Sequence, residues 1–143
     1  FSVYGPYGRP DMAYYLFANS LLKSDPIILN NRGKMHRDMT YIDDIVDGIL
    51  LSIEYMFNTE LTQYHEIFNL GNNKPIQTID LLNIISKILD IQPKIFHAST
   101  KFESKFTLAD MTKSRELLGY NPKTNFDKGI KQFLDWYKEY EII

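Results

Sequence analysis

The alternation of amphipathic helices with short apolar strands is the feature that most constrains the fold of this chain. Apolar side chains recur every three or four residues in four long segments, which is typical of helices that bury one face. Strands that alternate with helices indicate an α/β fold. The expected helices span about 12–23, 43–57, 78–89 and 125–137, with a shorter one at 110–119, and the expected strands span 1–3, 27–29, 66–71 and 94–97.

Each expected helix begins at a residue type that commonly caps a helix N-terminus. Gly119 is expected to end the short helix, since glycine readily adopts the left-handed conformation found there. Polar loops are expected at 30–36, around Gly33, and at 100–107. The expected capping residues are Asp11, Asp43 or Asp44, Thr78, Asp110 and Asn125.

The apolar helix faces need more partner surface than these short strands provide. Segments 1–3 and 67–70 have the composition of inner strands of a parallel sheet, which pack against neighbours on both sides. The chain supplies few such neighbours for them. We therefore expect it to be the second part of a larger fold.

Composition excludes several classes of function. Sixteen basic and eighteen acidic side chains give a formal net charge of -2, which argues against a nucleic-acid binder. There is no cysteine, so disulfides and thiolate metal sites are excluded. His65 and His97 have no partner at metal-ligand spacing, so no metal site is expected. No apolar run reaches about eighteen residues, so we expect no membrane span and a cytoplasmic location.

Two arginines are candidates for binding an anion. Arg9 stands in a Gly/Pro-rich loop directly after the first expected strand, a common position for a ligand-facing side chain. Arg37 follows the Gly33 loop and precedes Asp38, so a buried ion pair is the alternative to a ligand contact. A guanidinium fork suits a carboxylate or a phosphate. The residues alone leave open whether each arginine binds a ligand or has a structural role.

Several motifs in fixed order resemble one known family. Residues 2–12 (SVYGPYGRPDM) and 33–46 (GKMHRDMTYIDDIV) are similar to the extended short-chain dehydrogenase/reductase family. The similarity is greatest to the NAD-dependent nucleotide-sugar epimerases, especially the UDP-glucuronate 4-epimerases. Further matching segments are 67–72 (IFNLGN), 109–113 (ADMTK), 118–122 (LGYNP) and 133–137 (FLDWY), so that the resemblance covers nearly the whole chain.

The resemblance implies that the reaction chemistry is located elsewhere. The family's N-terminal part carries a glycine-rich loop for the NAD pyrophosphate and a Tyr-x-x-x-Lys pair. This sequence has seven scattered glycines, and none of its ten tyrosines has a lysine four residues later. The resemblance therefore implies that 1–143 form the substrate-binding C-terminal part, with end strands of a Rossmann sheet plus a small substrate-binding domain. The N-terminal NAD-binding Rossmann part is then absent from this sequence, and no residue of 1–143 is catalytic.

The resemblance also implies which residues contact a UDP-sugar and NAD. It places Arg37 at the nucleotide diphosphate and Arg9 at the sugar carboxylate. The remaining substrate-binding residues are Ser2 beside the sugar and Asn30 and Asn31 at the uracil. The segment from Tyr4 to Pro6 is expected to pass beside the nicotinamide. Asp38 and Asp43 are expected to orient the backbone and cap a helix rather than to touch the substrate.

One segment departs from the family pattern. Relatives usually carry a Gly-Asp step, often two residues after an arginine or glutamine, that helps to clamp the nucleotide. Here residues 100–105 read TKFESK, in which Lys101 and Glu103 could substitute only in part.

Three alternatives remain open from the sequence. The chain is expected to be inactive alone, as part of a UDP-glucuronate 4-epimerase-like enzyme that needs its missing N-terminal half or self-associates. Another nucleotide-sugar epimerase or a 4,6-dehydratase is the second possibility. A non-catalytic remnant or interaction module is the third.

Overall fold

The computed structural model describes residues 1–58, 65–101 and 103–141. The combination of strands and helices confirms the expected α/β class. In chain order the elements are β1 (Ser2–Tyr4), α1 (Ala13–Leu22), β2 (Ile27–Asn30), the short 3-10 helix η1 (Asn31–Gly33), β3 (His36–Tyr41), α2 (Ile42–Asn58), β4 (Pro75–Gln77), α3 (Thr78–Leu89), β5 (Ile95–Ala98), α4 (Thr112–Leu118) and α5 (Phe126–Tyr140).

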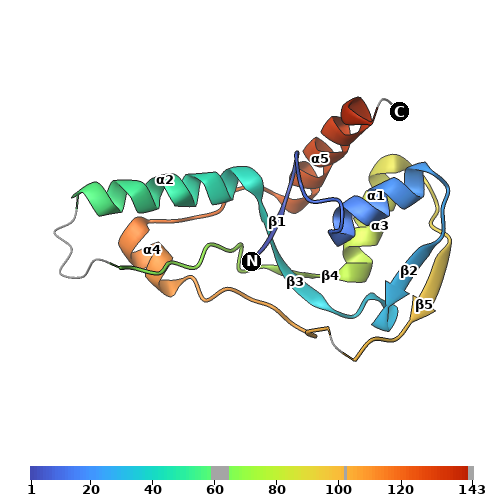
Figure 1. The fold of residues 1–143 in the computed structure, drawn as a ribbon, viewed down its shortest axis with the longest axis horizontal. Helices are drawn as coiled ribbons and strands as arrows, with labels where there is room; N and C mark the ends of the chain where they lie inside the picture. Colours follow the sequence, from blue (N-terminus) through green and yellow to red (C-terminus); the bar gives the residue numbers. More distant parts are fainter. Residues whose placement is uncertain (59–64, 102, 142–143) are drawn as a thin grey trace.

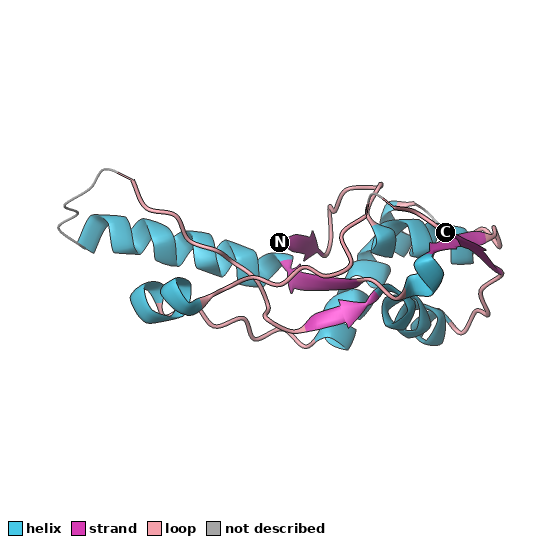
Figure 2. Ribbon diagram, turned by 90° about the horizontal axis from the view of Figure 1, so that it is seen from below, coloured by secondary structure: helices cyan, strands magenta, loops and turns pink. Residues whose placement is uncertain are grey.

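Strand β3 joins the two ends of an elongated molecule. It is the central strand of a three-stranded sheet in the order β1-β3-β4, with β1 parallel and β4 antiparallel to it. Strands β2 and β5 form a separate parallel pair. Figure 1 shows α2 and α4 at one end of β3, and α1, α3, β2 and β5 at the other. Figure 2 shows the same elongation from below.

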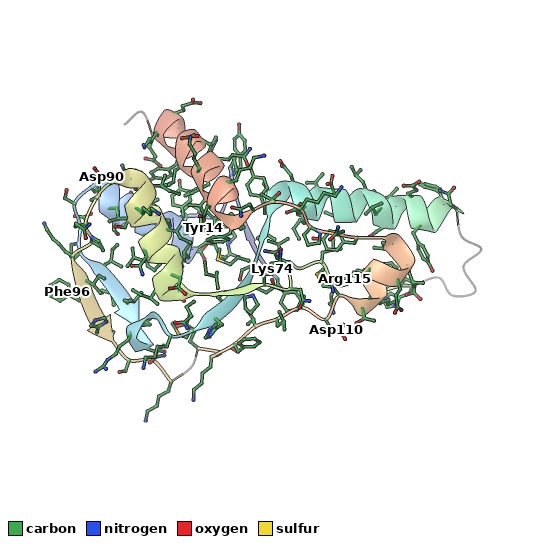
Figure 3. The ribbon with its side chains drawn as sticks, turned by 180° about the vertical axis from the view of Figure 1, so that it is seen from behind. Tyr14, Lys74, Asp90, Phe96, Asp110 and Arg115 are labelled. Carbon is green, nitrogen blue, oxygen red and sulfur yellow. The ribbon has the colours of Figure 1, made fainter. Side chains whose placement is uncertain are left out.

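The main hydrophobic core lies among α1, α3 and α5. It is rich in aromatic residues: Tyr14, Phe133 and Tyr137 are each fully buried, and the Tyr14 and Phe133 rings meet edge to face at 4.7 Å. Figure 3 shows Tyr14 in the interior and Phe96 at the outer edge of the molecule. Burial raises the pKa of the Tyr14 and Tyr137 hydroxyls to about 12. A smaller buried cluster, which includes Met111 and Tyr120, joins α4 to α2.

Helix α2 leaves much of its apolar stripe exposed. The sequence predicts helical spacing of these apolar positions, and the structure confirms the helix. Exposed side chains along it include Val46, Ile49 and Ile53, at 44–49%, and Phe57, at 77%. A run of large apolar side chains in water is unusual for a complete folding unit. The expectation that the apolar helix faces lack partner surface is therefore confirmed for α2 among the described residues, whereas α1, α3 and α5 bury their apolar faces in the main core.

The strand predictions are correct in part. Segments 1–3, 27–29 and 94–97 correspond to β1, β2 and β5, with ends shifted by one residue. The predicted strand at 66–71 is wrong, because this segment forms neither strand nor helix, and Ile67 is 65% exposed. An inner parallel strand needs a ladder of hydrogen bonds to strands on both sides, and no described strand pairs with this segment. Strands β3 and β4 were not predicted as strands.

Most of the predicted caps are replaced by other contacts. Met12 occupies the N-cap of α1, and Asp11 instead pairs with Arg9. Helix α2 begins at Ile42, and the Asp44 carboxylate accepts hydrogen bonds from the amides of Lys123 and Thr124, at 2.9 and 3.2 Å. Neither side chain therefore caps its own helix: Asp11 pairs within its own loop, and Asp44 connects α2 to the segment before α5.

The remaining caps give a mixed result. Gln77 is the N-cap of α3, and the Thr78 hydroxyl donates to the carbonyl of Met35. Asp110 accepts a hydrogen bond from the Thr112 amide, one residue before the N-cap of α4. Asn125 caps α5 as predicted, accepting from the amides of residues 127 and 128. Gly119 ends α4 in the left-handed conformation, at φ 66°, also as predicted.

Candidate functional site

Two adjoining cavities lie beside β1 and β3. The first, of about 430 Å³, is lined by the first nine residues together with Met12, Tyr14 and Ile42. The second, of about 180 Å³, is lined by Arg37, Gln77, Thr78 and Glu103, among others. Ser2 and Met12 line both cavities, so the two are neighbours. The volume of the first lies within the range of about 300–1,000 Å³ that is typical of small-molecule sites.

These cavities bring together five of the seven predicted site residues. Ser2, Tyr4, Pro6 and Arg9 line the first cavity, and Ser2 and Arg37 line the second. Neither Asn30 nor Asn31 lines either cavity, as the described residues define them. A separate cavity of about 340 Å³ between α2 and residues 119–123 contains none of the seven.

Arg37 is held in place by two segments of the chain. Its Nη1 donates to the carbonyls of His36 and Ser104, at 2.9 and 2.8 Å, and its Nη2 lies 2.7 Å from Glu103 Oε1. The side chain is only 21% exposed. The predicted alternative of an ion pair is therefore realised, with Glu103 as the partner rather than Asp38. A guanidinium has five N–H donors, so these contacts do not exhaust its capacity.

Asp38, the next residue, joins three separate segments. Its fully buried carboxylate accepts hydrogen bonds from the amides of Asn72, Asn73 and Ala109, at 3.0, 3.2 and 3.0 Å. A Cβ added at Gly71 would lie 2.7 Å from Asp38 Oδ2, so only glycine fits beside this carboxylate. The predicted role of Asp38 in orienting the backbone is confirmed, and it fixes the strand that carries Arg37.

Arg9 projects from the loop between β1 and α1. Its side chain is 75% exposed and forms a two-point contact with Asp11, whose side chain is also largely exposed. The hydrogen bond to Asp11 raises the pKa of Arg9, and the same contact holds the pKa of Asp11 below its usual range. Because both side chains are exposed to solvent, an ion pair of this kind contributes little to stability.

Tyr4 contributes to the core as well as to the cavity wall. Its ring packs against those of Tyr14, Tyr41 and Phe126, and the residue is 1% exposed. Burial and the nearby Asp44 carboxylate raise the pKa of its hydroxyl. The predicted approach of Tyr4 and Pro6 to a nicotinamide remains a prediction.

Three polar residues beside Arg37 in the second cavity were not predicted as site residues. Gln77 and Thr78 enter the second cavity because β4 pairs with β3 and places the start of α3 beside Arg37. No periodic pattern marks β4, which has only three residues and begins with a proline. Glu103 was noted only as part of the divergent segment 100–105, and Phe102 of that segment lies outside the described residues.

Neither a metal site nor a membrane span is present in the part of the chain that the structure describes. There, no group of three or more His, Asp or Glu residues could hold a metal ion. None of the described helices is long and apolar enough to cross a membrane.

Comparison with known proteins gives consistent matches to one family. Residues 1–71 match the family model of the NAD dependent epimerase/dehydratase family. An uncharacterized protein of Methanocaldococcus jannaschii is 44% identical over 97% of this chain and 41% of its own length. UDP-glucuronate 4-epimerase 3 of Arabidopsis thaliana is 36% identical over 98% of this chain and 35% of its own length. The chain thus spans less than half the length of these relatives.

The solved structures agree with the sequence relatives. The UDP-glucuronic acid 4-epimerase from Bacillus cereus, solved with UDP-glucuronic acid and NAD, matches with a TM-score of 0.88. It is 29% identical, and the match covers 98% of this chain and 44% of that one. The chain therefore belongs to the NAD dependent epimerase/dehydratase family, and its α/β fold is that of the C-terminal part of extended short-chain dehydrogenase/reductase epimerases.

Proposed function

We propose that this chain is the nucleotide-sugar-binding part of an NAD-dependent UDP-glucuronate 4-epimerase-like enzyme, and that it is inactive alone. The observation that carries the proposal is the position of Arg37. Its partly buried guanidinium lines the second cavity. This cavity shares Ser2 and Met12 with the larger first cavity, which Arg9 lines. One elongated ligand with a diphosphate and a carboxylate suits two such arginines, since each binds an anion through a planar fork.

The cofactor fits this chain only in part. The segment from Tyr4 to Pro6 lines the first cavity, where the nicotinamide is expected. The 143 residues hold no glycine-rich loop for the NAD pyrophosphate and no Tyr-x-x-x-Lys pair. When bound, NAD would supply the hydride acceptor and donor of the epimerisation. The role of this chain is to bind and orient the sugar nucleotide.

An NAD-binding half must therefore come from outside these 143 residues. Two exposed features suit its docking. The apolar face of α2, with Val46, Ile49 and Ile53, faces water, and β1 is an edge strand of its sheet. A second copy of this chain is the other candidate to cover these features. A cytoplasmic location remains a prediction from the sequence.

The Arg37→Ala variant tests the diphosphate contact. We assume for this test a restored enzyme, in which the chain is joined to the NAD-binding half of a UDP-glucuronate 4-epimerase. Loss of a charge-assisted contact in a shielded site should weaken UDP and UDP-glucuronate alike, by about 2–3 kcal/mol or roughly 30–150-fold. Calorimetric titration measures both affinities. Lys34→Ala, which removes an exposed cation two residues before β3, is the control and should stay within about twofold. A loss below threefold for Arg37→Ala would remove the diphosphate role.

The Arg9→Ala variant tests the sugar carboxylate and separates the glucuronate enzyme from other members of the family. It should weaken UDP-glucuronate by about tenfold or more and leave UDP-glucose and UDP nearly unchanged, since only the first ligand carries a carboxylate. Arg9→Lys should restore part of the loss, because lysine offers a charge without the planar fork. Equal losses for all three ligands would point instead to another nucleotide-sugar epimerase or to a dehydratase.

A further inference from the structure

Asn31 uses both polar atoms of its side chain on a single residue of a distant loop. Its Nδ2 donates to the carbonyl of Thr100 at 3.1 Å, and its Oδ1 accepts from the amide of Thr100 at 3.2 Å. This reciprocal pair resembles the exchange of hydrogen bonds between two β-strand residues. The amide group thereby holds the segment after β5 against the turn after β2.

The turn that presents Asn31 has an unusual backbone. Asn31, Arg32 and Gly33 all have positive φ angles, of 48°, 56° and 69°. Asparagine and glycine adopt this left-handed conformation more readily than other residues do. The sequence Asn-x-Gly at 31–33 therefore suits the turn as well as the contact with Thr100.

The segment that Asn31 holds is the one that contacts Arg37. Three and four residues after Thr100, the Glu103 carboxylate and the Ser104 carbonyl accept hydrogen bonds from the Arg37 guanidinium, at 2.7 and 2.8 Å. Farther along, the His36 amide donates to the carbonyl of Lys105 at 2.9 Å. Residues 103–105 thus lie beside the start of β3, and the Asn31–Thr100 pair precedes them in the chain.

We infer that Asn31 is a positioning residue for the anion site. By fixing Thr100, it sets the place of Glu103 and Ser104, and these two groups orient the Arg37 guanidinium in the second cavity. Asn31 then acts on the nucleotide through Arg37 rather than by touching the uracil. This inference rests on the proposed function, in which Arg37 binds the diphosphate.

Titration of the restored enzyme with UDP tests the inference. Asn31→Ala should weaken UDP about five- to tenfold, which is 1–1.4 kcal/mol. Asn31→Asp keeps an acceptor for the Thr100 amide but loses the donor, so it should restore part of the affinity. The matched control is Lys34→Ala, whose exposed side chain directly follows the turn and lines neither cavity. It should bind UDP as the unchanged protein does.

A double variant separates a positioning role from a purely structural one. If Asn31 acts through Arg37, Asn31→Ala should cause no further loss of UDP affinity in the Arg37→Ala background. An equal loss in both backgrounds, or an unchanged affinity for Asn31→Ala alone, would overturn the inference while leaving the proposed function intact. If Arg37→Ala itself leaves UDP affinity unchanged, the proposed function fails instead.

Hydrogen exchange of the 143-residue chain gives a readout that needs no ligand. The Thr100 amide should exchange at least about tenfold faster in Asn31→Ala, because its acceptor is gone. The guanidinium protons of Arg37 should exchange faster as well, whereas Lys34→Ala should change neither. Unchanged exchange at Arg37 in Asn31→Ala would show that the Asn31–Thr100 pair does not orient the Arg37 side chain.

Discussion

Replacing Asp38 with alanine should destabilise the chain by about 3–5 kcal/mol, a large part of the 5–15 kcal/mol that holds most domains folded. The carboxylate is fully buried and accepts from three backbone amides, at residues 72, 73 and 109. Alanine would remove the acceptor of all three amides and leave the buried amide of Ala109 unsatisfied. Urea unfolding, followed by circular dichroism, measures the free energy.

Two further variants show whether the loss of stability in Asp38→Ala is caused by the lost hydrogen bonds. Asp38→Asn retains one side-chain oxygen, so at least one amide keeps its acceptor. Its free energy of unfolding should therefore fall by less than that of Asp38→Ala. Asp43→Ala removes an exposed carboxylate from the first turn of α2 and should cost less than about 1 kcal/mol. If Asp38→Ala lowered the free energy of unfolding no more than Asp43→Ala does, the inference that Asp38 stabilises the fold by joining these segments would be wrong.

The helices could be predicted from the sequence because each carries its own periodic pattern. The structure confirms helices at all the predicted segments, with ends that differ by a few residues. Their first residues were harder to predict, since Asp11 and Asp44 bind partners other than the first amides of their own helices. Arg9 engages Asp11, and the amides of residues 123 and 124 engage Asp44. The contacts of Asp44 follow from tertiary structure, which local propensity does not contain.

The strands could be predicted less well because a strand depends on its neighbours. Segment 66–71 has the pattern of a buried strand, yet the described residues place no strand beside it. In contrast, β3 carries the polar sequence HRDMTY, and pairing with β1 and β4 makes it the central strand. Its Asp38 and Thr40 are buried, which alternation of apolar and polar residues alone would not predict.

Part of the candidate site could be predicted, since its residues stand in motifs that the chain shares with a family. Ser2, Arg9 and Arg37 meet at two adjoining cavities, although the residues come from distant parts of the sequence. The partners of Arg37 could not be predicted, because Glu103 and Ser104 reach it only through the packing of their loop against β3. The same packing gives Asn31 its contact with Thr100.

The central claim is that this chain holds the sugar nucleotide and that the hydride chemistry needs an added NAD-binding half. The claim separates binding residues from reacting residues, so the two parts should be active only together. Within these 143 residues, no tyrosine has a lysine four residues later, and the glycines are scattered. The exposed apolar face of α2 provides a surface on which the second part can dock.

The most direct test is an NMR assay of UDP-glucuronate with NAD, in which formation of the C4 epimer is followed over time. Three samples are compared: this chain, the NAD-binding half of a UDP-glucuronate 4-epimerase, and the two together. We expect no turnover in either single sample and epimer in the mixture, with less epimer when the chain carries Arg37→Ala. Turnover by the 143-residue chain alone would contradict the account, as would a stable complex of the two parts that forms no epimer.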